Sequence, residues 1–235
     1  MQAEPYPPDR LSIRLEGSSA PVSGLLLVPD PCSAGLVLAH GAGAGMSHAF
    51  MAATAAGLHA RGVATLRYQF PYMERGSRRP DGPAVAQATV RAAVDEADRR
   101  LAGVPLFAGG KSFGGRMTSQ AQAAAALPNV RGIAFLGFPL HPAGKPSVDR
   151  ARHLDAVRIP MLFQQGTRDA LAEPALIRQV VDALGPRAAM LMVPDADHSF
   201  HVPARSGRSD SEVLDQVLDA VAAWMTRTTG APDLS

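Results

Sequence analysis

The chain has 235 residues, of which 46% are hydrophobic, and 23 basic and 21 acidic residues give it a formal net charge of +2. This length and apolar content predict a single α/β domain over 1–235, with an ordered core of about 10–226. The basic residues are scattered and do not alternate with aromatic ones, which argues against a nucleic-acid partner.

The single cysteine, Cys32, has no partner for an internal disulfide, and no cysteine–histidine cluster has the spacing of a metal site. The first residues lack the apolar core of a signal peptide, and no stretch is apolar enough to cross a bilayer. We therefore expect a cytoplasmic protein that does not contact membranes and needs no metal.

Eight apolar runs have the length of β-strands: 11–15, 22–28, 36–39, 63–70, 104–108, 130–138, 161–165 and 188–193. From the third run onward, segments with helical periodicity separate the strands. This alternation predicts right-handed crossovers and a mostly parallel sheet covered by helices on both faces. No helix separates the first two runs, so we expect an antiparallel hairpin at one edge.

The last helix is predicted to begin at a capping box formed by Ser209 and Glu212 and to pack its apolar stripe on the sheet. The segment between the runs at 130–138 and 161–165 is too short for a lid domain. We expect an open cleft, roofed only by the loops 70–83 and 139–148.

Residues 110–114 read Gly-Lys-Ser-Phe-Gly between a predicted strand and a predicted helix. A serine on so tight a turn needs neighbours without side chains, and the pattern G-x-S-x-G is typical of a nucleophile at such a turn. Ser112 is the predicted nucleophile. A phosphate-binding loop ending in Gly-Lys-Ser would require glycine at position 105, where this chain has Pro105, so nucleotide binding is disfavoured.

A serine nucleophile needs a base, and the base needs a carboxylate to orient it. Asp169 follows the strand at 161–165, and His198 follows the strand at 188–193, so both should meet Ser112 at one sheet edge. Asp195 is kept as a second candidate for the acid. Asp197 is a poor candidate because side chains adjacent in sequence diverge.

The glycine-rich segment 40–45 follows the strand at 36–39 and is suited to stabilising an oxyanion with a backbone N–H. We assign the two donors to Ala42 and Phe113, with positions 41 and 43 as alternatives to Ala42. His40 is expected to brace this loop rather than to transfer protons.

Apolar and aromatic residues on the flanking loops are candidates for a substrate pocket. They are Phe70, Tyr72, Met73, Phe138, Leu140, His141 and Phe200. Several of them are also candidate core residues, and His141 and His201 are expected to be surface or supporting groups. Lys111 is adjacent to Ser112, but side chains diverge on such a turn, so we assign it no catalytic role.

The elbow at 110–116, the Gly-Thr-Arg-Asp segment ending at Asp169 and the Asp-His turn at 197–198 resemble those of the α/β-hydrolase superfamily. The chain is similar to its small, lidless, dienelactone-hydrolase-like branch. The further segments 40–45, 67–74 and 138–146 resemble a group of hydrolase-like proteins that includes an animal testis-expressed protein and a subunit of a histone-acetylating complex. The resemblance covers about 15–226.

The resemblance implies an α/β-hydrolase fold with Ser112 as nucleophile, Asp169 as acid and His198 as base. Dienelactone hydrolases have cysteine at the elbow, whereas this chain has serine. We expect a serine hydrolase that cleaves a small carboxylic ester, thioester or lactone through an acyl-enzyme, without a cofactor. The alternative is a binding or scaffold protein on a hydrolase fold, and peptidase activity is a weaker third. The sequence leaves the oligomeric state open.

Overall fold

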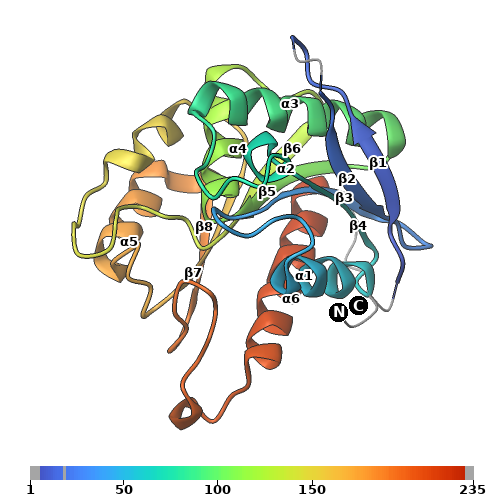
Figure 1. Cartoon of the computed structure of the whole chain (residues 1–235). Helices are drawn as coiled ribbons and strands as arrows, with labels where there is room; N and C mark the ends of the chain where they lie inside the picture. The colour runs from blue at the N-terminus through green and yellow to red at the C-terminus, as the bar shows by residue number, and fades with distance from the viewer. Residues whose placement is uncertain (1–5, 18–19, 231–235) are drawn as a thin grey trace.

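The computed structural model describes residues 6–17 and 20–230. The strands in these residues form one eight-stranded sheet in the order β1-β2-β4-β3-β5-β6-β7-β8 (Figure 1). The strands are β1 (Asp9–Ile13), β2 (Val22–Leu27), β3 (Ala34–Ala39), β4 (Val63–Tyr68), β5 (Leu106–Lys111), β6 (Val130–Leu136), β7 (Met161–Gly166) and β8 (Ala188–Val193). The expected boundaries of the ordered core, 10 and 226, fall inside the described part, whereas 1–5 and 231–235 lie outside it.

Strand directions follow the prediction of a mostly parallel sheet with one antiparallel edge. β1 pairs with β2 in an antiparallel ladder, and β2 pairs antiparallel with β4. The ladders from β4 through β3, β5, β6 and β7 to β8 are all parallel. The carboxyl ends of the parallel strands therefore meet at one edge, where loops from several strands come together.

The main difference from the predicted strands concerns β5, which we expected at 104–108 with a glycine turn after it. The strand instead begins at Leu106 and continues through Gly109 and Gly110 to Lys111. The glycines stay in the ladder because the neighbouring backbone leaves no room for a side chain: a Cβ on Gly109 would lie 2.0 Å from the carbonyl oxygen of Ala134. At Gly109 the absence of a side chain permits close packing of β5 against β6.

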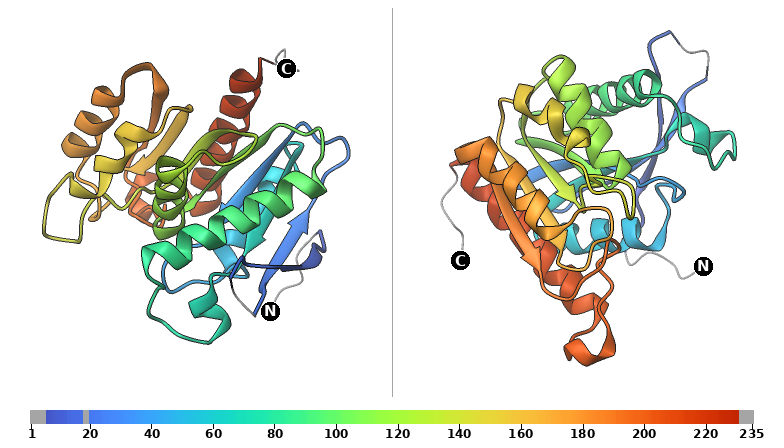
Figure 2. Two further views of the ribbon diagram at one scale, coloured as in Figure 1. Left: turned by 90° about the horizontal axis from the view of Figure 1, so that it is seen from above. Right: turned by 90° about the vertical axis from the view of Figure 1, so that its left-hand side faces the viewer.

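Helices cover both faces of the sheet, as the alternating pattern predicted (Figure 2). The apolar sides of α1 and α6 pack on one face, and those of α3, α4 and α5, with the short 3₁₀ helix η1, pack on the other. The helices are α1 (Ala49–His59), α2 (Pro71–Glu74), α3 (Pro83–Arg100), α4 (Phe113–Ala124), α5 (Pro174–Leu184) and α6 (Asp210–Thr229), and the 3₁₀ helices are η1 (Asp149–Ala156), η2 (Gly185–Arg187) and η3 (Ala204–Ser206).

Two sequence predictions about the outer elements are confirmed. Ser209 and Glu212 form a reciprocal capping box at the start of α6. Between β6 and β7 the chain has only a loop and η1, so there is no lid domain in this described segment. Among the residues that the structure describes, no helix is both long and apolar enough to cross a membrane.

Candidate active site

Ser112 lies on a strained turn between β5 and α4. Its backbone angles are φ 50° and ψ −114°, in a region that residues with side chains rarely occupy. Flanking glycines permit this turn. A Cβ on Gly110 would lie 2.3 Å from the carbonyl oxygen of Ala39, and one on Gly114 would lie 2.5 Å from that of His40. The spacing of the G-x-S-x-G pattern is thus a steric requirement of the close approach between this turn and β3.

The turn brings Ser112 to the imidazole of His198, 86 residues further along the chain. His198 Nε2 lies 2.8 Å from Ser112 Oγ, and His198 Nδ1 lies 2.7 Å from Asp169 Oδ2. Because a carboxylate only accepts, Nδ1 carries the proton and Nε2 has a free lone pair toward the hydroxyl. The His198 side chain is 22% exposed and that of Asp169 is 0% exposed, so the relay runs from a buried charge to an accessible serine.

Asp169 is held by donors besides the imidazole. The backbone N–H of Leu171 donates to Oδ1 at 2.7 Å, and Gln165 Nε2 donates to Oδ2. Gln165 Oε1 also accepts from the backbone N–H of Phe138 at 2.9 Å. These bonds offset part of the desolvation cost of a buried carboxylate and fix its orientation. The sequence prediction assigned no role to Gln165, although a polar amide at the end of the apolar run 161–165 was a signal for one.

The two alternative acids lie elsewhere. Asp197 Oδ1 accepts from the backbone N–H groups of Ser199 at 2.7 Å and His201 at 3.0 Å, so this carboxylate closes the turn that carries His198. Asp195 is exposed, and its backbone N–H donates to Thr167 Oγ1. Asp169 is therefore the carboxylate that contacts His198.

The glycine-rich loop after β3 lies against the serine, since a Cβ on Gly41 would be 3.8 Å from Ser112 Cβ. Ala42 is exposed, and within the described residues its backbone N–H has no hydrogen-bond acceptor. Phe113 is the first residue of α4, so its N–H lacks a partner within the helix. Both predicted donors are thus available.

His40 braces this loop. Its Nδ1 lies 2.8 Å from the carbonyl oxygen of Gly41, and its Nε2 accepts from the backbone N–H of Phe70 at 3.1 Å. Burial lowers the pKa of His40 to about 4, against an opposing effect of the bond to Gly41, so the ring stays neutral. A neutral ring with this tautomer connects two loops without titrating near neutral pH.

His141 has a parallel role in the loop after β6. Its Nδ1 lies 2.9 Å from the carbonyl oxygen of Pro142, and its Nε2 accepts from the backbone N–H of Glu173 at 3.2 Å. The residue is 1% exposed. It is a buried brace between the loop and the start of α5, not a surface histidine. His201 is exposed, as expected, and its Nδ1 pairs with Asp210 at 2.8 Å.

The residues predicted to line a substrate pocket are mostly buried in the core. Five are at most 2% exposed, namely Phe70, Tyr72, Phe138, Leu140 and Phe200, and Met73 is half-buried. Phe70 and Tyr72 pack edge-on against the half-buried ring of Phe113, at centroid distances of 5.4 and 6.5 Å. Phe113, which follows Ser112 directly, and Met73 are half-buried and retain some exposed surface.

Lys111 differs most from its prediction. Its side chain does not diverge into solvent, because its Nζ donates to the backbone carbonyl of His198. The ammonium lies 5.3 Å from the ring centroid of Phe200 and 5.8 Å from that of Phe50. The residue before the nucleophile therefore contacts the loop that carries the base.

A second serine–histidine contact lies on α4 and η1. Ser119 Oγ is 2.7 Å from His153 Nε2, and the same hydroxyl donates to the carbonyl oxygen of Arg116 at 3.0 Å. Ser119 is 0% exposed. This hydroxyl is closed off from any substrate.

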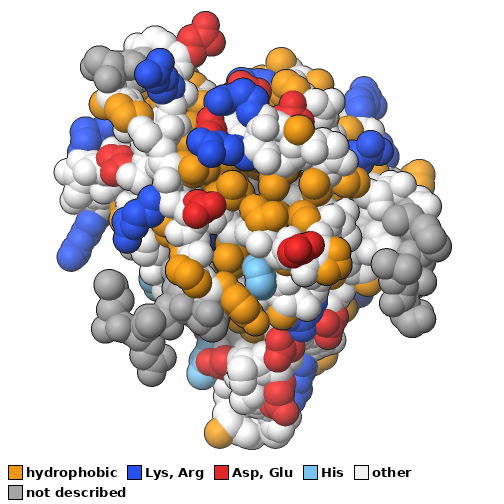
Figure 3. Space-filling view, turned by 90° about the vertical axis from the view of Figure 1, so that its right-hand side faces the viewer, with side chains coloured by type: hydrophobic (Ala, Val, Ile, Leu, Met, Phe, Trp, Pro, Cys, Tyr) orange, Lys and Arg blue, Asp and Glu red, His pale blue; other side chains and the backbone are white. Residues whose placement is uncertain are grey.

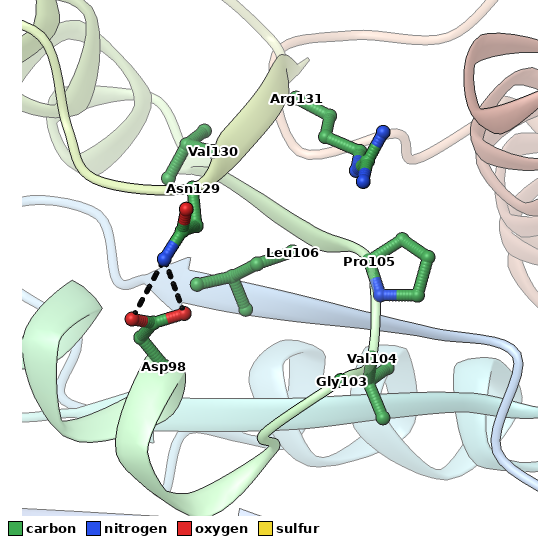
Figure 4. Close-up of a pocket in the computed structure, with 8 residues that line it drawn as sticks. All are labelled: Asp98, Gly103, Val104, Pro105, Leu106, Asn129, Val130 and Arg131. Carbon is green, nitrogen blue, oxygen red and sulfur yellow. Dashed lines mark hydrogen bonds between the residues drawn. The ribbon is translucent and has the colours of Figure 1, made fainter.

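One cavity in the described structure has a volume of about 390 Å³ (Figure 4), and Ser112 is not among the residues that line it. It is lined by the residues that precede β5 and β6, including Asp98 and Asn129, which hydrogen bond at 2.9 and 3.0 Å. This is the amino-terminal edge of the strands, opposite the elbow. Another cavity, about 190 Å³, lies between η1 and α5.

On the face that includes the β1 edge, positive and negative side chains are intermixed (Figure 3).

Comparisons with known proteins agree with this architecture. The structure is similar to that of a dienelactone hydrolase from Anabaena variabilis, with a TM-score of 0.75, 19% identity, and coverage of 94% of this chain and 98% of that one. It is also similar to an α/β serine hydrolase without a lid from Xanthomonas campestris, with a TM-score of 0.68, 18% identity and 98% coverage of both chains. A third match is Est1E from Butyrivibrio proteoclasticus, with a TM-score of 0.70, 16% identity, and coverage of 94% and 99%.

At these identities the structural matches establish the fold, and the sequence match establishes the family. Residues 32–226 match the α/β hydrolase domain family, a span from just before β3 to the last turn of α6. The chain therefore belongs to the α/β hydrolase domain family.

Proposed function

We propose that the protein is a serine hydrolase that cleaves a small carboxylic ester, thioester or lactone through an acyl-enzyme intermediate. The observation that carries the proposal is the continuous relay from Ser112 Oγ through His198 to Asp169, with contacts of 2.8 and 2.7 Å. A relay of this geometry raises the nucleophilicity of a hydroxyl because the base accepts its proton as the oxygen attacks.

In the acylation step Ser112 Oγ attacks the carbonyl carbon while His198 Nε2 takes the hydroxyl proton. Asp169 stays ionised and stabilises the imidazolium that forms. Negative charge develops on the carbonyl oxygen, and the N–H groups of Phe113 and Ala42 are the donors proposed to stabilise it. His198 then gives its proton to the leaving alcohol, thiol or ring oxygen, and the acyl group remains on Ser112.

In the deacylation step water takes the place of the leaving group. His198 Nε2 accepts a proton from the water as its oxygen attacks the acyl carbon, and returns a proton to Ser112 Oγ as the acid departs. The absence of a lid between β6 and β7 in the described chain favours small substrates in an open site. The names of the structural neighbours, a dienelactone hydrolase and a serine hydrolase, support this reaction class only through the shared fold.

The alternative is a binding protein that uses a hydrolase fold without turnover. One observation favours it: most of the predicted pocket residues are buried, which leaves little apolar surface beside Ser112 for an acyl chain. The retained relay favours the enzyme, because a binding function gives no reason to keep a buried carboxylate behind an imidazole.

Labelling by a fluorophosphonate probe, followed by a panel of short acyl esters, thioesters and lactones, separates the two functions. We expect covalent labelling of the full chain and turnover of at least one panel member. An unlabelled protein that cleaves none of the panel would contradict the proposed function and support the binding alternative.

A further inference from the structure

The position of His198 depends on a loop that projects beyond β8. The turn at 197–201 is closed internally by Asp197, which accepts from two backbone N–H groups within the turn. These bonds set the shape of the turn, but they do not connect it to the strand that carries the nucleophile. A second contact is needed to keep the imidazole at a fixed distance from Ser112.

Lys111 provides such a contact. It is the last residue of β5 and precedes Ser112 directly, and its Nζ donates to the backbone carbonyl of His198 itself. A Cβ on Gly137 would lie 2.9 Å from this Nζ and 3.4 Å from His198 Cε1, so the ammonium and the imidazole lie together over the glycine after β6. One side chain thus joins the strand of the nucleophile to the residue of the base.

The surroundings of the ammonium hold it in this position. The rings of Phe50 and Phe200 stack at 6.2 Å with an angle of 11° between their planes, and Nζ lies within 6 Å of both centroids. Such distances allow cation–π attraction. The charged or titratable groups that face Nζ are Asp169 after β7, Asp197 in the turn, and His198.

We infer that Lys111 is a positioning residue for the proposed hydrolase, whose ammonium fixes the loop of His198 so that the imidazole stays between Asp169 and Ser112. The inference rests on the proposed function, because it assigns Lys111 to that same reaction. Lys111 makes no contact with the reacting atoms. It acts through the backbone of the base.

The size of the effect follows from the geometry. A proton relay with contacts of 2.7 and 2.8 Å tolerates little displacement, and a misplacement of about 1 Å reduces turnover about 10²-fold. Loss of the contact between Lys111 and the backbone carbonyl of His198 should lower kcat and leave KM almost unchanged, since the ground-state contacts of the substrate are not altered.

The charge state of Lys111 gives a second readout. Burial lowers the pKa of Lys111 to about 8, although the carboxylates of Asp169 and Asp197 act in the opposite direction. The charged ammonium therefore predominates below pH 8 and is lost as the pH rises through 8, together with the cation–π attraction. Turnover should fall over the same range.

The experiment compares Lys111→Met, which keeps the length of the chain without its charge, with Lys111→Arg, which keeps the charge at every accessible pH. The matched control is Lys145→Met, because Lys145 is the other lysine of the chain and is exposed on the loop after β6. Fluorophosphonate labelling rates and the kinetics of the best ester are measured from pH 6 to 10, with circular dichroism of each variant.

We expect Lys111→Met to lose about 10²-fold in kcat and labelling rate, Lys111→Arg to recover part of that loss, and Lys145→Met to match the parent. The parent should show a falling alkaline limb near pH 8 that Lys111→Arg lacks. Equal labelling of Lys111→Met and the parent, or an unchanged alkaline limb in Lys111→Arg, overturns the inference alone. If Lys111→Met does not fold, the inference is tested by the alkaline limb of the pH–rate profile of Lys111→Arg, which should be absent. A parent protein that is neither labelled nor active overturns the proposed function as well.

Discussion

Among the residues that the structure describes, two serine–histidine pairs differ little in contact distance. Ser112 Oγ lies 2.8 Å from His198 Nε2, and Ser119 Oγ lies 2.7 Å from His153 Nε2. Distance alone therefore does not distinguish a reactive hydroxyl from a structural one. The pairs differ in the access to the serine, in its backbone conformation, and in the group behind the imidazole.

The electrostatic surroundings of the imidazole differ between the two pairs. Asp169 accepts from His198 and favours the imidazolium that must form during attack. His153 has no such carboxylate: burial and then the nearby charge of Arg116 lower its pKa to about 4. Ser119 is also buried within α4, whereas Ser112 is on a strained turn with part of its surface exposed. The comparison indicates that the electrostatic environment and access, rather than the hydrogen bond, make a serine a nucleophile.

The largest expected effect comes from removing each hydroxyl in turn. Ser112→Ala should reduce ester turnover by on the order of 10⁴-fold or more, because the covalent step is lost. Ser119→Ala should leave turnover within about threefold of the parent and lower stability by roughly 1–2 kcal/mol, because the buried hydroxyl loses its hydrogen bonds to Arg116 and His153. Initial-rate kinetics and urea unfolding of both variants measure this. Equal turnover of Ser112→Ala and the parent contradicts the assignment.

The next largest effect tests the charge behind the imidazole. Asp169→Asn should reduce kcat by on the order of 10³-fold or more, because an amide can donate to the ring and stabilise the wrong tautomer. Arg116→Met removes a positive charge that lowers the pKa of His153, and it should leave kcat unchanged within about twofold. The kcat values of both variants are measured with the same ester. A kcat in Asp169→Asn within tenfold of the parent would show that the carboxylate does not orient the base.

The fold and the relay follow from local patterns that are strong in this sequence. Strand–helix alternation and the position of Ser112, Asp169 and His198 after β5, β7 and β8 were sufficient to predict the sheet and to place the three residues at one edge. Such patterns report backbone periodicity and topology. They do not report which side chains fill the space between loops.

The residues that sequence analysis missed or misplaced act through side-chain packing across distant segments. Lys111 was expected to diverge from the site, but it reaches a carbonyl 87 residues away. Among the candidate pocket residues, Phe138 and Leu140 are core, and His141 has the supporting role that was one of its two expected positions rather than a place in an open pocket wall. Amphipathic side chains and aromatic residues are compatible with either environment, so only the three-dimensional packing assigns them.

A smaller effect is expected from the sterics of the elbow, which the pair on α4 does not share. Gly114→Ala places a Cβ 2.5 Å from the backbone oxygen of His40 and should destabilise the protein by roughly 1–3 kcal/mol. Gly82→Ala is the control, because no atom lies within 4 Å of its Cβ and its φ is −60°. The midpoints of urea unfolding measure the stability of both variants. A Gly114→Ala variant as stable as Gly82→Ala would contradict the steric account of the elbow.

The smallest effect concerns the pH dependence of stability at the second pair. The pKa of His153 is lowered from 6.5 to about 4 in the folded protein, so the unfolded chain binds the extra proton between these values. Stability from this group is present above pH 6.5 and is lost as the pH falls toward 4, and contact of the half-buried ring with solvent reduces the size of this loss. His153→Gln should flatten the stability curve between pH 6.5 and 4 relative to the parent, as measured by urea unfolding. If the stability of the parent and of His153→Gln changed with pH in the same way, the lowered pKa of His153 would be excluded.

The most direct test of the distinction between the two serines is the site of covalent modification. The parent protein is treated with a fluorophosphonate at pH 7.5, digested, and the modified peptide is sequenced by tandem mass spectrometry. The account predicts one adduct, on Ser112, with Ser119 unmodified. An adduct on Ser119, or an unmodified Ser112 in a folded protein, would contradict it.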